Sequence, residues 1–451
     1  MKLYTVLIAS VAALGGLLFG FDTAVIAGAI SPLKSYFNLG DEAIGLVVAI
    51  AAIGCIPGAF FAGRFADYFG RKKMMAATAL LFIIAAIGCG VAGNFTQLVV
   101  YRFVGGLAIG MASTLAPIYI SEIAPPAFRG RLGMLQQLAI VIGILLAFVS
   151  NYLIANANYT FLTNENHWRY MLAAALVPSL LFFLLILMIP ESPRWLMLKN
   201  KFDQAGKVFR NIYEKNIADI EVEIVKADIR TDTRKIKFAE IFSSKYKKIV
   251  VIGVLFASIA QLTGINIIFY YAPLIFEKTY VSSSVLFQTI LTGVVNLIFT
   301  LVAFAMIDKI GRKKLLLSGS AIMGFCMLLI GYLFHINKLN NYFVLISIFV
   351  YIAAFACTWG AVLWVYVAEI FPNRIRGHAT SFAIFGNWVM NAIISFTFPM
   401  LLSGLGGSTT FFIYGIINLS MILFVNKYIF ETKGIPLEEI EHVYSEYLLI
   451  K

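Results

Sequence analysis

A pattern of charged residues occurs twice in this chain, each copy lying between long apolar stretches. GRFADYFGRKK in the first half returns as MIDKIGRKK in the second, with 241 residues between Asp67 and Asp308. A second motif, YISEIAPPAFRG from Tyr119, returns as YVAEIFPNRIRG from Tyr366, 247 residues later. This duplication predicts two halves of one fold, which is how transporters with parallel repeats are built around a substrate.

The apolar stretches between the charged motifs are too long and too continuous for a water-soluble domain. Hydrophobic residues make up 61% of the 451 residues and charged residues 13%. About 20 apolar residues form a helix that crosses a hydrocarbon core of roughly 30 Å, and twelve such runs fit between the polar breaks. The predicted spans are 3–30, 43–66, 73–93, 98–121, 130–155, 167–189, 247–276, 283–307, 313–335, 342–369, 377–403 and 408–430.

The net charge of +12 alone would be compatible with nucleic-acid binding, but the distribution of the charge argues against it. Basic residues gather in alternate short loops, as in Arg71 to Lys73 and Arg312 to Lys314, which marks those loops as cytoplasmic. We therefore expect a multi-pass protein of the inner membrane with both termini in the cytoplasm. The four cysteines all fall in predicted spans without paired spacing, so neither disulfides nor a Cys-type metal site is expected.

The spans group into four segments along the chain. We predict an N-terminal six-helix bundle over 1–189 and a C-terminal six-helix bundle over 247–430. The polar stretch 190–246 has apolar residues at helical spacing, including Val208, Phe209 and Ile212, and predicts short amphipathic cytoplasmic helices; a plain linker is the alternative. The tail 431–451 is expected to form a helix after Pro436.

Asp22 and Arg102 are the ionisable residues most clearly inside predicted spans. Each would cost about 2.5–3.5 kcal/mol at a bilayer centre, so we expect them to pair. The pair either locks two helices together permanently, or Asp22 loads and releases a proton while Arg102 acts as a movable cation partner. Glycine runs in the first span (Gly15 to Gly20) and the fourth (Gly105 to Gly110) would allow these two helices to pack closely.

The repeated loop motifs also carry acids at matched positions. Asp67 and Asp308 precede Gly-Arg-Lys by three residues, and Glu122 and Glu369 precede an arginine by seven. Topology signals explain the basic residues but not these acids, and we therefore predict inter-helix salt bridges that close the inner side. The gate residues are Asp67, Arg71, Glu122, Arg129, Glu191, Arg194, Asp308, Arg312, Glu369, Arg376 and Glu431.

Uncharged amides concentrate in a few spans, near aromatic residues such as Trp364 and Trp388. Carboxamides donate and accept hydrogen bonds, so with aromatic faces they suit a neutral polyol such as a sugar. Contacts between helices are the alternative role for the amides. Gly264, in QLTGIN, is a natural place for a helix to break beside a substrate.

Six strings in order along the chain resemble the sugar porter family of the major facilitator superfamily, which includes bacterial sugar-proton symporters and animal facilitative glucose transporters. They are GRFADYFGRKK, YISEIAPPAFRGR, PESPRWL, QLTGINIIFYYAP, EIFPNRIRG and ETKG. The resemblance implies an all-α fold of twelve transmembrane helices in two pseudo-symmetric six-helix bundles, and import of a monosaccharide such as xylose, glucose or galactose by alternating access.

The resemblance also assigns roles by position. Asp22 and Arg102 fall on the family's proton-coupling pair, which favours symport over uniport because facilitators typically have a neutral residue at the aspartate. Departures from the family pattern are Ala260 in place of a second glutamine, Ala175 in place of a sixth-span glutamate found in some symporters, and Phe430 in place of proline. The implied sugar contacts are Gln137, Gln261, Asn266, Asn296, Trp364 and Asn387, with Phe19, Tyr270, Trp388 and Asn391 as neighbours.

Other functions find less support in the sequence. A proton-independent uniporter of the same fold is the nearest rival, and a membrane sugar sensor comes from a different class. A membrane enzyme is not expected, since the chain has no nucleotide loop or nucleophile triad. We expect no cofactor and no metal, no nucleic-acid partner, a lipid bilayer and a proton as partners besides the sugar, and function as a monomer.

Overall fold

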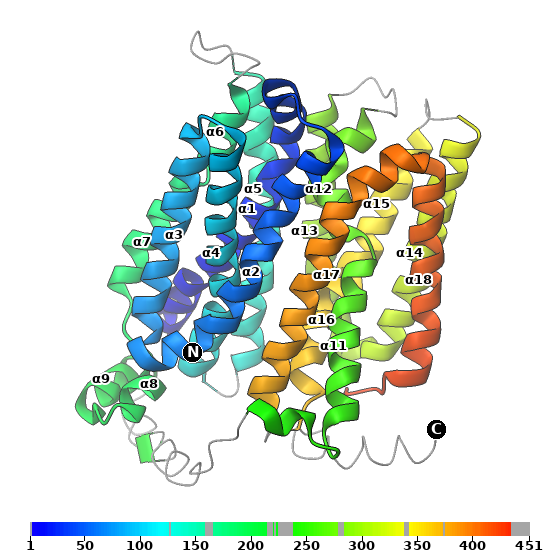
Figure 1. Cartoon of the computed structure of the whole chain (residues 1–451). Helices are drawn as coiled ribbons and strands as arrows, with labels where there is room; N and C mark the ends of the chain where they lie inside the picture. The colour runs from blue at the N-terminus through cyan, green and yellow to red at the C-terminus, as the bar shows by residue number, and fades with distance from the viewer. Residues whose placement is uncertain are drawn as a thin grey trace. The chain divides into compact units, whose positions relative to one another are not determined.

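The fold is described from a computed structural model of the chain, drawn in Figure 1. It describes residues 2–125, 128–157, 166–213, 220, 222–223, 238–277, 284–337, 342–372 and 375–433. Every regular element in these ranges is a helix. This agrees with the predicted all-α class.

The first half of the chain contains nine helices within the described ranges. They are α1 (Leu3–Phe37), α2 (Asp41–Phe69), α3 (Arg71–Val91), α4 (Phe95–Ile123), α5 (Arg129–Ala155), α6 (His167–Ala173), α7 (Leu176–Met188), α8 (Pro193–Leu198) and α9 (Phe202–Ile212). The second half begins with a short 3-10 helix, η2 (Phe238–Phe242), and continues with α11 (Lys247–Leu262), α12 (Ile265–Phe276), α13 (Val285–Ile310), α14 (Arg312–His335), α15 (Tyr342–Cys357), α16 (Trp359–Glu369), α17 (Arg376–Gly404) and α18 (Gly406–Tyr428).

Twelve helical segments within the described residues are long and apolar enough to cross a membrane. All twelve predicted spans are confirmed, and most boundaries agree within three residues. The largest difference is at α1, which continues through Pro32 to Phe37 instead of ending near residue 30. At 1.5 Å per residue, its 35 residues reach about 52 Å, so α1 is longer than the hydrocarbon core is thick.

Three spans are interrupted in the middle. The sixth is divided between α6 and α7, the seventh between α11 and α12, and the tenth between α15 and α16. The seventh breaks at Gly264, whose φ of +90° lies in the left-handed region that glycine adopts readily. The break predicted from QLTGIN is therefore present.

Corresponding helices of the two halves have corresponding neighbours. In the first half α3, the third span, packs on α4 and α7. In the second half α14, the ninth span, packs on α15 and α18. The third and ninth spans thus both contact the fourth and sixth members of their own set of six, as expected for a duplicated fold.

The contacts divide the chain into two compact units that do not coincide with the halves of the sequence. The first unit is Met1–Thr23, Gly54–Ile144 and Leu172–Lys235, and the second is Ala24–Ile53, Leu145–Met171 and Ile236–Lys451. The second unit therefore includes the C-terminal parts of α1 and α5, the N-terminal part of α2 and most of α6, together with the helices of the second half. Within it Ser31 on α1 donates a 2.9 Å hydrogen bond to Glu277 after α12. The predicted bundle boundaries at 189 and 247 rest on the duplication and stay a prediction.

The glycines of α1 make their closest approaches to α5 rather than to α4. A Cβ added at Gly16 would lie 2.7 Å from Gln136 Nε2, and one at Gly20 would meet the backbone of Ile140. The fourth-span glycine Gly110 instead faces the backbone of Cys55 on α2. Gly15 alone of the α1 run faces α4, at ordinary van der Waals distance from Ala112. On α4, Gly105 faces α1, since a Cβ there would lie 3.3 Å from Asp22 Oδ2. The predicted packing of the first and fourth spans is therefore present at Gly15 and Gly105, whereas Gly16, Gly20 and Gly110 face other helices, because spacing in a sequence does not say which neighbouring helix a face meets.

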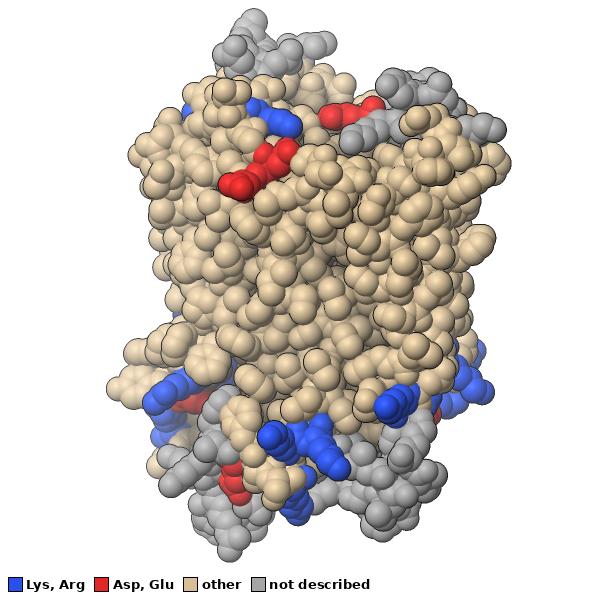
Figure 2. Space-filling view, turned by 45° about the vertical axis from the view of Figure 1, so that its right-hand side comes forward, with Lys and Arg blue, Asp and Glu red and all other residues tan. Residues whose placement is uncertain are grey.

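The segment after the sixth span forms short helices, as predicted. On α9 the residues Val208, Phe209 and Ile212 are buried, while the polar side chains on the opposite face are exposed. Of the tail 431–451, only Glu431 to Lys433 are described, so the helix expected after Pro436 lies outside the described residues. Figure 2 shows the charged side chains near the ends of the helices, with uncharged side chains over the middle of the surface in view.

Candidate functional site

Asp22 and Arg102 form a buried ion pair inside the first unit. Arg102 Nη1 lies 3.2 Å from Asp22 Oδ2 and the same distance from the Asp22 backbone oxygen. The exposed fraction is 8% for Asp22 and 2% for Arg102. α1 supplies the carboxylate and α4 the guanidinium, so the pair joins two spans.

This ion pair has a single-nitrogen geometry rather than a bidentate one. Arg102 Nε is buried without a hydrogen-bond partner in the described part of the chain. Gly105, one turn after Arg102, faces the carboxylate: a Cβ there would lie 3.3 Å from Asp22 Oδ2. Because a second parallel hydrogen bond is missing, the contact is held less rigidly than a fork-shaped Arg–carboxylate pair.

Four of the predicted sugar-contact amides form one network in the second unit. Gln261 Nε2 donates to Asn387 Oδ1 at 2.8 Å, and Gln261 Oε1 accepts from Asn266 Nδ2 at 2.6 Å and from Asn391 Nδ2 at 3.3 Å. Gln261 lies at the end of α11, Asn266 at the start of α12, and the other two on α17. The network therefore joins both sides of the helix break to α17.

Buried polar side chains donate hydrogen bonds to a backbone carbonyl at the helix break. The carbonyl oxygen of Thr263 accepts from Tyr351 Oη at 2.6 Å and from Asn418 Nδ2 at 3.0 Å. A helix end inside a membrane has carbonyls with no partner along the helix, and these side chains supply one. Tyr351 on α15 and Asn418 on α18 thus hold the break in place. The amide network of Gln261 lies on α11, α12 and α17.

The remaining predicted sugar contacts lie on α1, α5, α12, α13, α16 and α17. Asn296 on α13 is buried, and its side chain has no hydrogen-bond partner among the described residues. Tyr270 on α12 and Trp388 on α17 are buried, and Trp364 on α16 is half-buried. Gln137 on α5 and Phe19 on α1 are half-buried and belong to the first unit.

The first copy of the gate motif joins α2, α3 and α4. Arg71 donates to Glu122 through Nε at 3.0 Å and Nη2 at 2.9 Å, a bidentate pair, and Nη2 also lies 2.9 Å from Asp67 Oδ1. Glu191 accepts from the backbone N–H groups of Arg71 at 2.9 Å and Lys72 at 3.1 Å. The carboxylate of Glu191 therefore caps the N-terminus of α3, where a negative charge is favoured.

The second copy repeats this geometry in the other unit. Arg312 donates to Glu369 through Nε at 3.3 Å and Nη2 at 2.9 Å. Glu431 accepts from the backbone N–H groups of Arg312 at 2.9 Å and Lys313 at 3.1 Å, which caps α14. The duplicated motif thus builds the same arginine-centred cluster twice, each within one unit.

Other predicted gate residues lie beside these clusters. Arg194 is exposed at the start of α8, and Arg376 Nε and Nη2 donate to the carbonyl oxygen of Phe371 at 3.2 and 3.1 Å. The side chains of Arg129 and Asp308 lie outside what the structure describes. Each glutamate is bonded to the arginine that begins the third or ninth span.

Sequence reasoning missed several polar residues that support the arginine clusters, the amide network and the helix break. Thr432 donates a 2.6 Å hydrogen bond to Glu369, and Ser395 donates to Asn391 at 3.2 Å. Tyr351 and Asn418, behind the helix break, were also missed. Their polar character inside apolar spans was the available signal. Trp359 on α16 stacks on Phe256 and donates to Ser320 Oγ at 2.9 Å, which is a structural role.

Gly70 is expected to tolerate no side chain, since its φ is +104° and a Cβ there would collide with the Glu191 carboxylate. Gly70→Ala should lower the midpoint of thermal unfolding in detergent by several degrees. The matched control is Gly63→Ala on α2, the helix that ends just before Gly70, where a Cβ meets no atom within 4 Å and helix propensity favours alanine by about 1 kcal/mol. Equal midpoints for the two variants would show that the cap does not constrain this turn.

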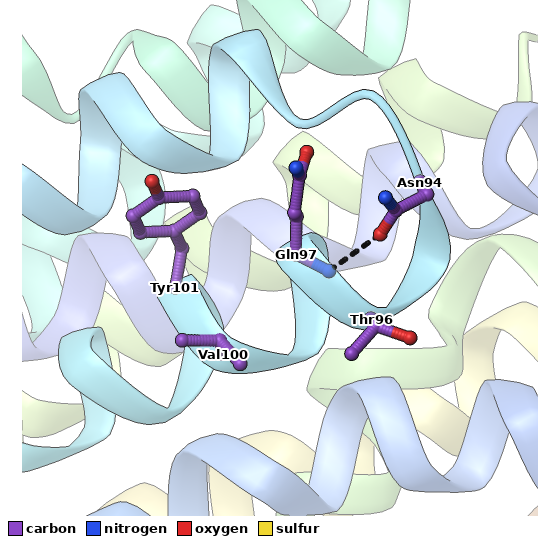
Figure 3. A pocket seen from close by; sticks show the side chains of 5 residues that line it. All are labelled: Asn94, Thr96, Gln97, Val100 and Tyr101. Atoms are coloured by element: carbon purple, nitrogen blue, oxygen red, sulfur yellow. Dashed lines mark hydrogen bonds between the residues drawn. The ribbon is translucent and has the colours of Figure 1, made fainter.

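A surface groove of about 340 Å³ at the start of α4 is lined by none of the residues of these clusters. Figure 3 shows its lining, in which Asn94 Oδ1 accepts from the backbone N–H of Gln97 at 2.9 Å. Gln97 Oε1 in turn accepts from the backbone N–H of Gly93 at 2.8 Å. These amides cap the helix, and the groove contains none of the predicted sugar contacts.

Comparison with known proteins places the whole chain in one group. The family described as "Sugar (and other) transporter" matches residues 8–444. The D-xylose-proton symporter of Escherichia coli (strain K12) is 38% identical, with 98% of this chain and 96% of that protein covered. The arabinose-proton symporter of Bacillus subtilis (strain 168) is also 38% identical, covering 98% and 95%.

A solved structure is similar over the same extent. It is the major facilitator superfamily proton:xylose symporter XylE bound to 6-bromo-6-deoxy-D-glucose, with a TM-score of 0.82, 37% identity and 98% of each chain covered. The fold of twelve transmembrane helices in two pseudo-symmetric bundles is therefore the major facilitator fold. The resemblance stated from the sequence motifs is confirmed, and this multi-pass membrane protein belongs to the sugar transporter family.

Proposed function

We propose that this protein imports a monosaccharide, a pentose or hexose such as xylose, glucose or galactose, by alternating access coupled to proton symport. The buried ion pair of Asp22 and Arg102 is the observation that carries the coupling. A carboxylate with 8% exposure and one monodentate cation partner can exchange that partner for a proton at modest cost. The relatives are named a D-xylose-proton symporter and an arabinose-proton symporter, and these names support a sugar and a proton as the two transported species.

The sugar site of this proposal is built around the amide network of Gln261. Its amides bond to one another, and sugar hydroxyls can replace these bonds one for one without leaving a buried group unpaired. Asn296, whose amide has no partner among the described residues, provides a further donor and acceptor. Gln137, Trp364 and the aromatic neighbours complete the set that the family resemblance implies.

In this proposal the protein lies in the inner membrane with both termini in the cytoplasm and works as a monomer. The basic residues of both motif copies, Arg71 to Lys73 and Arg312 to Lys314, support this orientation. The proposal is tested by adding xylose, glucose or galactose to vesicles that contain the purified protein and a pH-sensitive dye inside, with no gradient imposed. Symport predicts acidification of the interior as sugar enters. Sugar entry without a pH change identifies a uniporter, and sugar binding without entry identifies a sensor.

The duplicated arginine clusters are proposed to act as the inner gate. Glu122→Gln combined with Glu369→Gln removes the carboxylates that pair with Arg71 and Arg312. Both arginines then lose their charge-assisted bidentate bonds to these glutamates. If these contacts form only when the inner side is closed, the variant shifts toward the inward-open state. Distances between spin labels on the cytoplasmic ends of the two halves should then lengthen. Glu42→Gln, at the other end of α2, is the control, and an unaltered distance distribution would reject the gating role.

A further inference from the structure

A groove of about 500 Å³ lies beside the C-terminal end of α2, within the first unit. The last two turns of α2 line one side, and Lys199, the residue after α8, lines the other. The lining residues are Arg64, Phe65, Asp67, Tyr68, Phe69 and Lys199. None of the sugar contacts or the proton-coupling pair belongs to this groove.

The groove carries an excess of positive charge. Arg64 is exposed, and no ion pair joins it to another residue that the structure describes. Lys199 Nζ lies 5.7 Å from the ring centroids of Tyr68 and of Trp195. The acid in the groove, Asp67, is already bonded to Arg71 at 2.9 Å. Arg71 also pairs with Glu122, so the excess charge is counted on the lining itself: two cations, Arg64 and Lys199, against the single carboxylate of Asp67.

The groove continues into an exposed aromatic stripe along α2. Phe65 is 44% exposed and Phe69 49%, and Tyr68 at the helix end is 71% exposed. The ring centroids of Phe61 and Phe65 lie 6.0 Å apart, and those of Phe65 and Phe69 6.5 Å apart. Since α2 is a membrane-spanning helix, this stripe meets acyl chains, with cations at its end.

We propose that this groove binds the headgroup of an anionic phospholipid. The phosphate would lie between Arg64, whose planar guanidinium suits phosphate oxygens, and Lys199, which adds a point charge. The acyl chains would then run along Phe61, Phe65 and Phe69. A lipid satisfies the charge and the apolar surface together, whereas a free phosphate or an acidic peptide satisfies only the charge.

Native mass spectrometry of the full chain in neutral detergent tests this proposal, with dioleoyl phosphatidylglycerol as the probe. Phosphatidylcholine with the same chains serves as the neutral comparison. Wild type is expected to bind one phosphatidylglycerol more tightly than phosphatidylcholine. Arg64→Gln with Lys199→Gln should weaken binding of this first phosphatidylglycerol roughly 30-fold, because each basic residue near a membrane surface contributes on the order of 1 kcal/mol.

The charge-matched control is Lys73→Gln with Arg131→Gln, two exposed residues of the same unit outside the groove. It should change the affinity less than twofold. If the groove variant does not fold, the single variants are measured and each should weaken binding about fivefold. Equal weakening by groove and control variants would overturn the site. Displacement of the lipid by millimolar inorganic phosphate, or by a polyglutamate peptide at equal concentration, would overturn the lipid as its occupant.

Discussion

Asp22→Asn is expected to abolish uphill accumulation of sugar driven by a proton gradient, while leaving sugar-for-sugar exchange intact. Ionised Asp22 holds Arg102 at 3.2 Å, and asparagine imitates the protonated form permanently. Without a change of charge at this position, proton binding no longer favours one arrangement of α1 and α4 over another. Asp22 has no assigned sugar contact, so binding and exchange should persist. Both activities are measured in the same vesicles with labelled sugar.

Asp41→Asn provides the matched control for this variant. Asp41 also pairs with a cation, Lys34 at 3.6 Å, but both side chains are substantially exposed. Such surface pairs contribute about 0–1 kcal/mol, so accumulation should be unchanged. Should Asp22→Asn still concentrate sugar, coupling through this carboxylate is wrong. Loss of exchange together with accumulation would instead indicate that the pair is a fixed structural lock between helices.

Gln261→Ala is expected to weaken sugar binding by about 1–3 kcal/mol, roughly five- to 150-fold in affinity. Gln261 has hydrogen bonds to Asn387, Asn266 and Asn391, so its removal leaves buried donors and acceptors without partners as well as deleting a contact. Sugar affinity can be measured by isothermal titration of the purified protein. The cost should appear in binding and in exchange, and the proton dependence of any residual uptake should remain.

Gln97→Ala is the control for the amide network. Gln97 is also a spanning-helix glutamine, but it caps the start of α4 at an exposed position. Its loss should lower stability slightly without affecting affinity. Equal affinities for Gln261→Ala and wild type would mean that the network joins helices and does not contact sugar.

The helices were predictable because each depends on local composition. A run of about 20 apolar residues can lie only in lipid, and the breaks between runs are polar, so the twelve spans follow from hydropathy. The pairing of Asp22 with Arg102 also followed, since two isolated charges of opposite sign in spans have few other partners. Gly264 was found for a similar reason: few residues other than glycine adopt its backbone conformation readily.

Contacts between distant residues were less predictable. Glu122 and Glu369 each precede an arginine by seven residues. The contact that the structure shows for each glutamate is with a different arginine, more than 50 residues away along the chain. Similarly, the glycines of α1 marked a close helix contact but not α5 as the partner. The hydroxyl groups of Thr432 and Tyr351 donate to Glu369 and to the Thr263 carbonyl oxygen. The sequence does not show that these acceptors lie nearby, so it could not assign a role to either hydroxyl.

The most direct test of proton-coupled import is the steady-state sugar ratio in vesicles with an imposed proton gradient. One pH unit corresponds to about 1.4 kcal/mol, so coupling of one proton per sugar sustains a gradient of up to about tenfold. Wild type is predicted to raise the internal sugar concentration above the external one, and to return it to equality when an ionophore collapses the proton gradient. A ratio that never exceeds one, with rapid exchange of labelled sugar, would contradict symport and identify a uniporter.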